Sequence, residues 1–336
     1  MKILKPLLTL AAIALLITSC NKTDEFAAEQ NSTFPADGVI RVATSVANPQ
    51  TRAGMTSDNL ENFQMRIINS VNSDYSYYAN MSRNAGVWSS FVFGEDNSES
   101  LTLLWQNNTN KIKVSAVSHI ILLPDQGLWE DGHILFIPDN QEEENVMQAA
   151  DVLYMAEKEI DPSKDLVNGK IQIELKHRLS KLNLTVKMGT EFNKLTDGTA
   201  TNLISDIIVG GTFVSGIWFM LNDDDMTPYK EPPYDYTIDI NPWHDIAAYK
   251  AGEGDVDQAI ANYECILIPQ SVDANVFNVS FKIGDRYFSW NSPSAVELLA
   301  DTQYNLTLNV GKDVVTVGGF TATPWTEADP QDLGTE

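Results

Sequence analysis

Residues 171–188, I-Q-I-E-L-K-H-R-L-S-K-L-N-L-T-V-K-M, decide the fold class. In the second half every second residue is apolar, and the residues between them are polar; the apolar ones are Leu182, Leu184, Val186 and Met188. Such alternation predicts a strand with one buried face. The apolar residues of the first half, Ile171, Ile173, Leu175 and Leu179, have the opposite parity. The phase therefore changes near Ser180 and Lys181, and we expect a β-bulge there, because one extra residue moves the following side chains to the other face.

The same two-residue period recurs along the chain. Further strands are expected at residues 39–46, 101–105, 111–117, 120–123, 304–310 and 314–325. Residues 277–283 and 287–290 are typical of a hairpin with Gly284-Asp285 as its turn. Helical patterns are confined to residues 142–150 and 294–300. Many short strands separated by frequent turns predict an all-β protein built of antiparallel sandwiches.

The N-terminus has the layout of an export signal. Lys2 and Lys5 precede an apolar run at residues 7–17, and small polar residues connect this run to Cys20. The run is shorter than the roughly 20 residues of a membrane-spanning helix. Signals of this shape that end in cysteine resemble those of bacterial lipoproteins, which implies removal of residues 1–19 and acylation of Cys20. Residues 20–36 are polar and without periodicity, and we expect them to be a tether.

Charge and length set further bounds. The formal charge is −24, and removal of the leader with its two lysines changes it to −26. A chain with this much negative charge repels the phosphate backbone of nucleic acids. A nucleic-acid partner is therefore not expected. The length predicts two domains. The polar segment 161–169 is the expected linker, which gives domains at 37–165 and 166–326 and an acidic tail at 327–336. Cys265 lies in an apolar stretch and is expected to be buried without a disulfide partner.

No motif indicates a catalytic, cofactor or metal site. The histidines are scattered at positions 119, 133, 177 and 244, with no metal-binding spacing. The acidic residues at 223–225 and at 255 and 257 do not complete a calcium-binding loop. An enzyme is therefore not expected. Several aromatic residues remain candidates for stacking on sugars, namely Trp218, Trp243, Tyr234 and Tyr236. They support an alternative function, a carbohydrate-binding outer-membrane lipoprotein of a glycan-uptake system.

Arginine is scarce, and two arginines lie next to turn-forming residues. Arg52 lies in N-P-Q-T-R-A-G, residues 48–54, and Arg83 in S-R-N-A-G, residues 82–86. Exposed loops of this composition are preferred sites of proteolysis. Arg52 is the stronger candidate, and an ordinary loop arginine remains the alternative.

Several segments together resemble the fimbrillin family, the type V pilins of Bacteroidales. They are the lipoprotein signal, T-R-A-G (51–54), L-E-N-F-Q-M-R-I (60–67), A-D-V-L-Y-M-A (150–156), K-H-R-L-S-K-L-N-L-T-V (176–186), L-I-P-Q (267–270), Y-N-L-T-L-N-V (304–310) and T-P-W (323–325). H-R-L-S-K-L and L-I-P-Q are the most specific of them. The resemblance extends over nearly all of the chain beyond the leader, in the expected order.

The resemblance implies two tandem transthyretin-like β-sandwich domains and transport to the outer membrane as a surface-exposed lipoprotein. It also implies assembly with other pilin subunits into a fimbrium that serves adhesion to a host or bacterial surface. An arginine-specific protease would cut between Arg52 and Ala53. The role of the subunit as stalk, tip or anchor stays open.

Cleavage after Arg52 suggests a mechanism of assembly. The released segment would carry strand 39–46, and its side chains Ile40, Val42 and Val46 would leave an apolar groove. A strand of a neighbouring subunit could fill this groove by donor-strand complementation. The expected donor is segment 314–325, with Val315, Val317 and Phe320 as the residues that insert.

Overall fold

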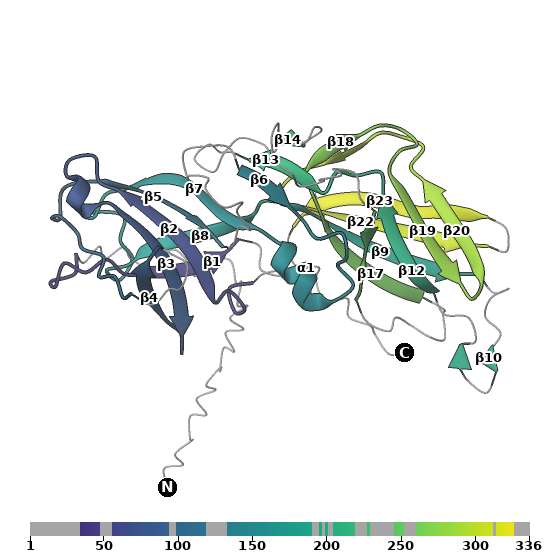
Figure 1. Ribbon diagram of the computed structural model, residues 1–336, viewed down its shortest axis with the longest axis horizontal. Helices are drawn as coiled ribbons and strands as arrows, with labels where there is room; N and C mark the ends of the chain where they lie inside the picture. Colours follow the sequence, from purple (N-terminus) through teal and green to yellow (C-terminus); the bar gives the residue numbers. More distant parts are fainter. Residues whose placement is uncertain are drawn as a thin grey trace, which may run out of the picture.

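A computed structural model of the chain describes residues 34–47, 56–93, 99–118, 133–189, 195–196, 199–200, 204–218, 227–228, 245–251, 260–311 and 314–325. Within these ranges nearly all regular structure is β (Figure 1), as the sequence predicts. The described helices are short: α1 (Glu144–Ala150) and a 3₁₀ turn at Ser73–Tyr75. None of the described helices is long and apolar enough to cross a membrane.

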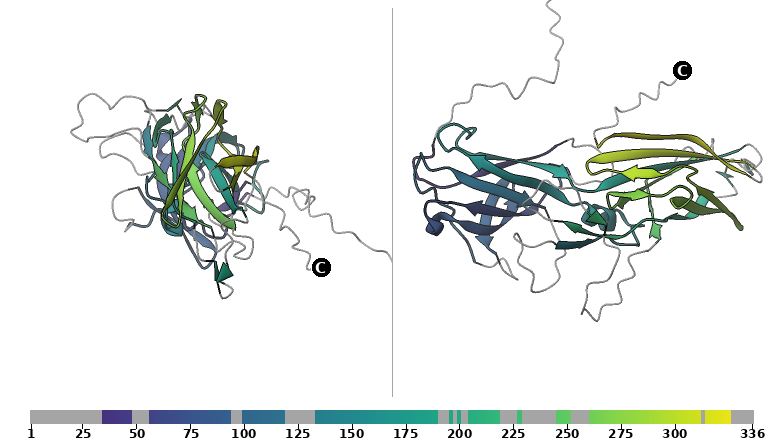
Figure 2. Two further views of the ribbon diagram at one scale, coloured as in Figure 1. Left: turned by 90° about the vertical axis from the view of Figure 1, so that its right-hand side faces the viewer. Right: turned by 90° about the horizontal axis from the view of Figure 1, so that it is seen from above.

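The first half of the chain forms a seven-stranded sheet at one end of an elongated molecule (Figures 1 and 2). In spatial order its strands are β1 (Val42–Val46), β8 (Ile171–His177), β7 (Leu153–Ile160), β5 (Ile112–Val117), β2 (Asn62–Ile68), β3 (Tyr77–Asn84) and β4 (Val87–Val92). β1 and β4 are thus the two edges of this sheet.

The second half forms a five-stranded and a four-stranded sheet at the other end (Figure 1). The five-stranded sheet runs β16 (Tyr249–Lys250), β17 (Ile260–Leu267), β9 (Ser180–Met188), β22 (Thr302–Val310) and β23 (Val315–Pro324). The four-stranded sheet runs β15 (Ile246–Ala247), β12 (Ile204–Gly210), β19 (Asn278–Ile283) and β20 (Arg286–Asn291). Smaller sheets complete the described structure: β14 (Thr227–Pro228), β13 (Ser215–Trp218) and β6 (His133–Phe136); β18 (Gln270–Val272) and β21 (Val296–Leu298); β10 (Leu195–Thr196) and β11 (Thr199–Ala200).

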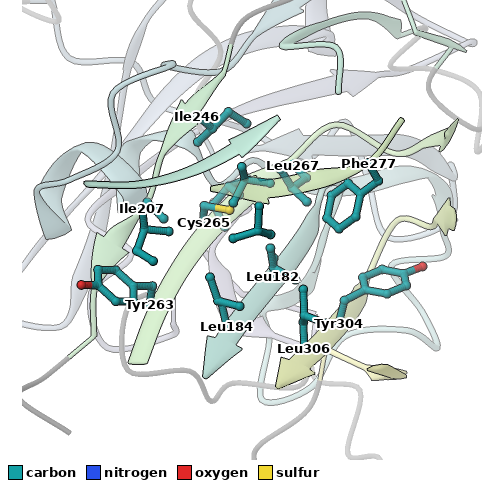
Figure 3. Close-up of a cluster of buried hydrophobic side chains, with 14 of the residues drawn as sticks. Leu182, Leu184, Ile207, Ile246, Tyr263, Cys265, Leu267, Phe277, Tyr304 and Leu306 are labelled. Carbon is teal, nitrogen blue, oxygen red and sulfur yellow. The ribbon is translucent and has the colours of Figure 1, made fainter. Parts of the chain in front are cut away.

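Two separate hydrophobic cores lie beneath these sheets. The first is built mainly from the seven-stranded sheet and includes Phe63, Met65 and Ile173. The second fills the space between the four- and five-stranded sheets, and Figure 3 shows part of it. Side chains there come from several strands, among them Leu182 on β9, Cys265 on β17 and Leu306 on β22. Cys265 is fully buried and carries a free thiol, as predicted, and burial raises the pKa of that thiol.

The change of phase near Ser180 has a different cause from the β-bulge that the sequence suggests. Ile171, Ile173 and Leu175 are buried in the first core, whereas Leu182 and Leu184 are buried in the second. The chain ends β8, passes through Arg178 and Leu179, and enters β9 in another sheet. The parity changes because the strand changes its sheet and its core, so the expected bulge is wrong.

The strands are mostly antiparallel, but two pairs are parallel. β1 pairs with β8, and β9 pairs with β22. In both pairs the two strands are separated by more than a hundred residues, and parallel pairing requires such a crossover instead of a tight turn. The sequence pattern marks these strands correctly but does not show which partner each of them has.

Most predicted elements are confirmed at the residues described. β19 and β20 form the expected hairpin, and Gly284 and Asp285 are its turn. Residues 142–150 contain α1, also as expected. Residues 294–300 are not helical, because they contain strand β21. Residues 101–105 form no continuous strand, although Leu103 is buried there and an isolated bridge joins Val39 to Leu104. The strand expected at 120–123 lies outside the described residues.

The segment expected to link two domains contributes one residue, Leu166, to the first core. Residues 161–169 connect β7 to β8, which are neighbours in one sheet, and Leu166 in this segment is fully buried. Helix α1, from the first half of the chain, instead contributes Met147 to the second core. The described residues after 178–179 contribute to the second core and not to the first, so we propose these residues as an alternative boundary.

Candidate functional site

The segment that cleavage after Arg52 would release carries three buried apolar residues, and they lie at one edge of the seven-stranded sheet. Ile40, Val42 and Val46 retain 6%, 6% and 3% of their exposure, and all three belong to the first core. Ile40 precedes β1, and the other two lie on β1 with Thr44 between them on the same face. The segment therefore buries a short apolar row against the sheet, while the alternate residues face outward.

β1 is bonded to the rest of the sheet through β8. Five residue pairs join the two strands, from Val42 opposite Ile171 to Val46 opposite Leu175. Hydrogen bonds flank the ladder, since Ile171 N–H donates to Arg41 C=O over 2.9 Å and Ala47 N–H donates to Leu175 C=O over 2.6 Å.

The outer side of β1 is held by isolated contacts. Ile40 N–H donates to Leu103 C=O over 2.8 Å, and Val46 N–H donates to Ser57 Oγ over 2.9 Å. On the face that points to the core, Trp88 Nε1 on β4 donates to Thr44 Oγ1 over 3.2 Å. No strand is paired with this side of β1 among the residues described.

A cavity of about 340 Å³ adjoins the segment that leads into β1. Its walls include Ile40 and Val42 on one side, Trp88 and Ser90 of β4 on another, and residues 100–103. The space beside these side chains is thus not filled by the rest of the core. Among the described residues β1 thus combines a buried apolar row, an outer side without a strand partner and an adjoining cavity.

The predicted donor segment forms β23, the edge strand of the five-stranded sheet. β23 pairs antiparallel with β22 over its whole length, and a register shift at Gly318 and Gly319 separates two regular stretches. Because of this shift, Val315, Val317 and Phe320 are opposite Val310, Leu308 and Leu306, three residues that share one face of β22. The three proposed insertion residues therefore share one face of β23 despite their uneven spacing.

β23 is covered only in part. Val317 is 42% exposed, and Val315 and Phe320 are partly buried. The Phe320 ring lies 6.1–6.5 Å from the rings of Phe277, Trp290 and Tyr304. Trp325, directly after the strand, is fully buried.

The H-R-L-S-K-L segment forms a buried polar junction between the two cores. The ring of His177 lies with Nδ1 3.0 Å from both carboxylate oxygens of Asp151, and the Arg178 guanidinium lies 4.9 Å from the centre of the Tyr154 ring. Lys181 Nζ is 2.7 Å from Glu264 Oε2. Burial lowers the pKa of Lys181, while Glu264 opposes that shift. Charged residues in an apolar stretch were the available signal of this junction, because such residues are buried only with partners.

The other sequence candidates fall into three groups. Arg83 is wrong as a loop site, because it lies on β3 and its guanidinium donates to Ser57 C=O over 2.7 Å. Most of the others lie outside the described residues: Cys20, Arg52, Ala53, His119, Asp223–Asp225, Tyr234, Tyr236, Trp243, His244, Asp255 and Asp257. Of His133 and Trp218 only the backbone is described, paired between β6 and β13. No group of three metal-binding side chains occurs in the described part of the chain.

Comparison with known proteins points to one family. The sequence matches the fimbrillin-like family over residues 46–325. Among solved structures, a candidate cell adhesion protein from Bacteroides ovatus superimposes with a TM-score of 0.59 at 13% identity, over 87% of this chain and 99% of that one. Another from Bacteroides uniformis gives a TM-score of 0.54 at 16% identity, over 87% and 100% of the two chains. A search of the curated proteins gives no match.

Proposed function

The chain belongs to the fimbrillin-like family, and from that premise we propose that it is a structural, non-enzymatic subunit of a cell-surface type V pilus with a role in adhesion and biofilm formation. We further propose that it reaches the outer membrane as a lipoprotein acylated on Cys20. The two hydrophobic cores would each belong to one of two tandem transthyretin-like sandwich domains. The observation that carries the assembly mechanism is β1, an edge strand with a buried apolar row and a single strand partner.

The mechanism begins with cleavage between Arg52 and Ala53. This cut separates β1 from the chain beyond Arg52, so that only non-covalent contacts hold the strand in the sheet. Burial of Ile40, Val42 and Val46 contributes roughly 5–9 kcal/mol, at about 1.5–3 kcal/mol for each side chain. Loss of β1 would expose the first five residues of β8 as an open sheet edge beside an apolar slot, a template for another strand.

A strand from a second subunit would then fill the slot. β23 suits this role because Val315, Val317 and Phe320 share one face and are at most partly buried in their own subunit. In the slot these side chains would gain apolar burial, and β8 would regain a ladder partner. Since donor and groove lie on different surfaces of the subunit, the contact does not close on itself and produces a filament.

The test is incubation of the purified protein with an arginine-specific protease. We expect a new N-terminus at Ala53 by sequencing, followed by a ladder of polymers on a gel. Arg52→Lys is the matched control, since it keeps the charge but removes the recognition site of the protease. Assembly of the Arg52→Lys protein as fast as the unaltered one would contradict the mechanism, as would an N-terminus that stays uncut.

A further inference from the structure

Trp325 directly follows β23 and contacts residues 177–179, where the chain passes from the first core to the second. These three residues are called the crossover below. Its ring stacks on that of His177, with 3.9 Å between centroids and 7° between planes. Its backbone N–H donates to Asp301 C=O over 2.9 Å, and Asp301 N–H donates to Leu179 C=O over 3.1 Å. Trp325 therefore contacts the crossover through its ring directly and through its backbone by way of Asp301.

Trp325 also holds the end of β23, beyond the backbone ladder with β22 and the contacts of the Phe320 ring. Most side chains of the strand are exposed, and Val315, Gly319 and Phe320 are only partly covered. Trp325 has no exposed surface at all. A fully buried Trp at one end of a largely exposed strand decides whether that end stays attached.

The crossover depends on β1 because β8 leads directly into it. β8 has seven residues, and its first five pair with β1. Only its last two, Lys176 and His177, pair with β7. Without β1, the part of β8 before Lys176 would have no strand partner among the described residues. His177 would then be held by two residue pairs with β7, by Asp151, by its stack on Trp325 and by the neighbouring Arg178, whose N–H donates to Val152 C=O over 2.8 Å.

We propose that the stack of Trp325 on His177 is a latch that couples the two ends of the assembly mechanism. While β1 occupies the sheet edge, β8 and the crossover are fixed, and Trp325 keeps β23 in its own subunit. Departure of β1 loosens β8, weakens the stack and allows β23 to detach. This inference rests on the proposed function, and it explains how a subunit avoids offering its donor strand before its own groove is open.

The latch is tested without protease or polymerisation, by hydrogen exchange on the intact chain. The residues of β1 that bond to β8 alternate, and the flanking bonds at Arg41 and Ala47 identify Ala43 as one of them. Ala43→Pro removes its N–H, and Ala43→Ser is the matched control that keeps it. We expect amides of β23 and of Trp325 to exchange at least about fivefold faster in Ala43→Pro, the effect of one lost hydrogen bond, and to be unchanged in Ala43→Ser.

A second variant covers the case in which Ala43→Pro does not fold. Coupling between two sites is reciprocal, so Trp325→Phe must speed exchange in β1 and β8 as well as in β23. The hairpin of β19 and β20 serves as the internal reference in both experiments. Faster exchange of β8 with β23 unchanged in Ala43→Pro, or faster exchange confined to β23 in Trp325→Phe, would overturn the latch. Neither result bears on cleavage at Arg52, so the two proposals fail separately.

Discussion

The contribution of β1 to stability can be predicted from two buried valines. Val42→Ala and Val46→Ala each remove two methyl groups that are at most 6% exposed and that lie opposite Ile171 and Leu175, both fully buried. At about 0.8 kcal/mol for each methyl group, plus a term for the cavity, each substitution should cost about 2 kcal/mol of unfolding free energy. The sites lie roughly 13 Å apart along the strand, so the double variant should lose about 4 kcal/mol.

Urea denaturation of the uncleaved protein measures this loss directly. Ser45→Ala is the matched control, since Ser45 lies between Val42 and Val46 on the alternate, outward face of β1, and it should change stability by less than about 0.5 kcal/mol. A double variant within about 1 kcal/mol of the unaltered protein would refute the reasoning. In that case β1 would contribute little to the core, and its removal could not create a groove worth filling.

Three further predictions follow from the same structure. Val317→Asp should leave monomer stability within about 0.5 kcal/mol, because Val317 is 42% exposed, yet it should abolish polymer ladders after cleavage; intact ladders would exclude Val317 from the donor face. Lys181→Met should cost about 3–5 kcal/mol by leaving Glu264 without its partner, and adding Glu264→Gln should recover much of that loss in urea denaturation. Because Arg41 lowers the pKa of Asp37 from 3.8 to about 2, the stabilisation from this pair is present above about pH 4 and lost as the pH falls through about 2; Asp37→Asn should remove that pH dependence from the unfolding curve.

The strands could be predicted from the sequence wherever one face is buried and the other is not. β9 and β22 alternate apolar and polar residues without a break, so their pattern alone marks them. Residues 294–300 mislead because a three-residue strand such as β21 is too short to show a period. The partner of each strand could not be predicted either, since side chains show which face is buried but not which backbone lies alongside.

The site could be predicted in part. The apolar row of Ile40, Val42 and Val46 is visible in the sequence, and the structure shows that these side chains are buried at a sheet edge. The contact of His177 with Trp325 could not be found in this way, because the two residues are far apart in the sequence and no local pattern connects them. Likewise, the polar composition of residues 161–169 is that of a linker, and a connection between two adjacent strands has the same composition.

The edge strands β1 and β23 differ in how firmly the proposed mechanism requires each to be held. This difference favours a control on the order in which they are released. In the proposed mechanism β1 must stay in place until cleavage, and its side chains buried in the first core hold it there. In the same mechanism β23 must be able to leave its own subunit once β1 has departed, and its largely exposed side chains favour that step. An edge strand so lightly held would pair with other chains at random unless something fixed it. A single buried Trp that contacts the crossover leading from β8 meets this need, because its hold weakens when the neighbour of β8 departs. The order of events, first an open groove and then a free donor, would thus follow from the connectivity of the fold.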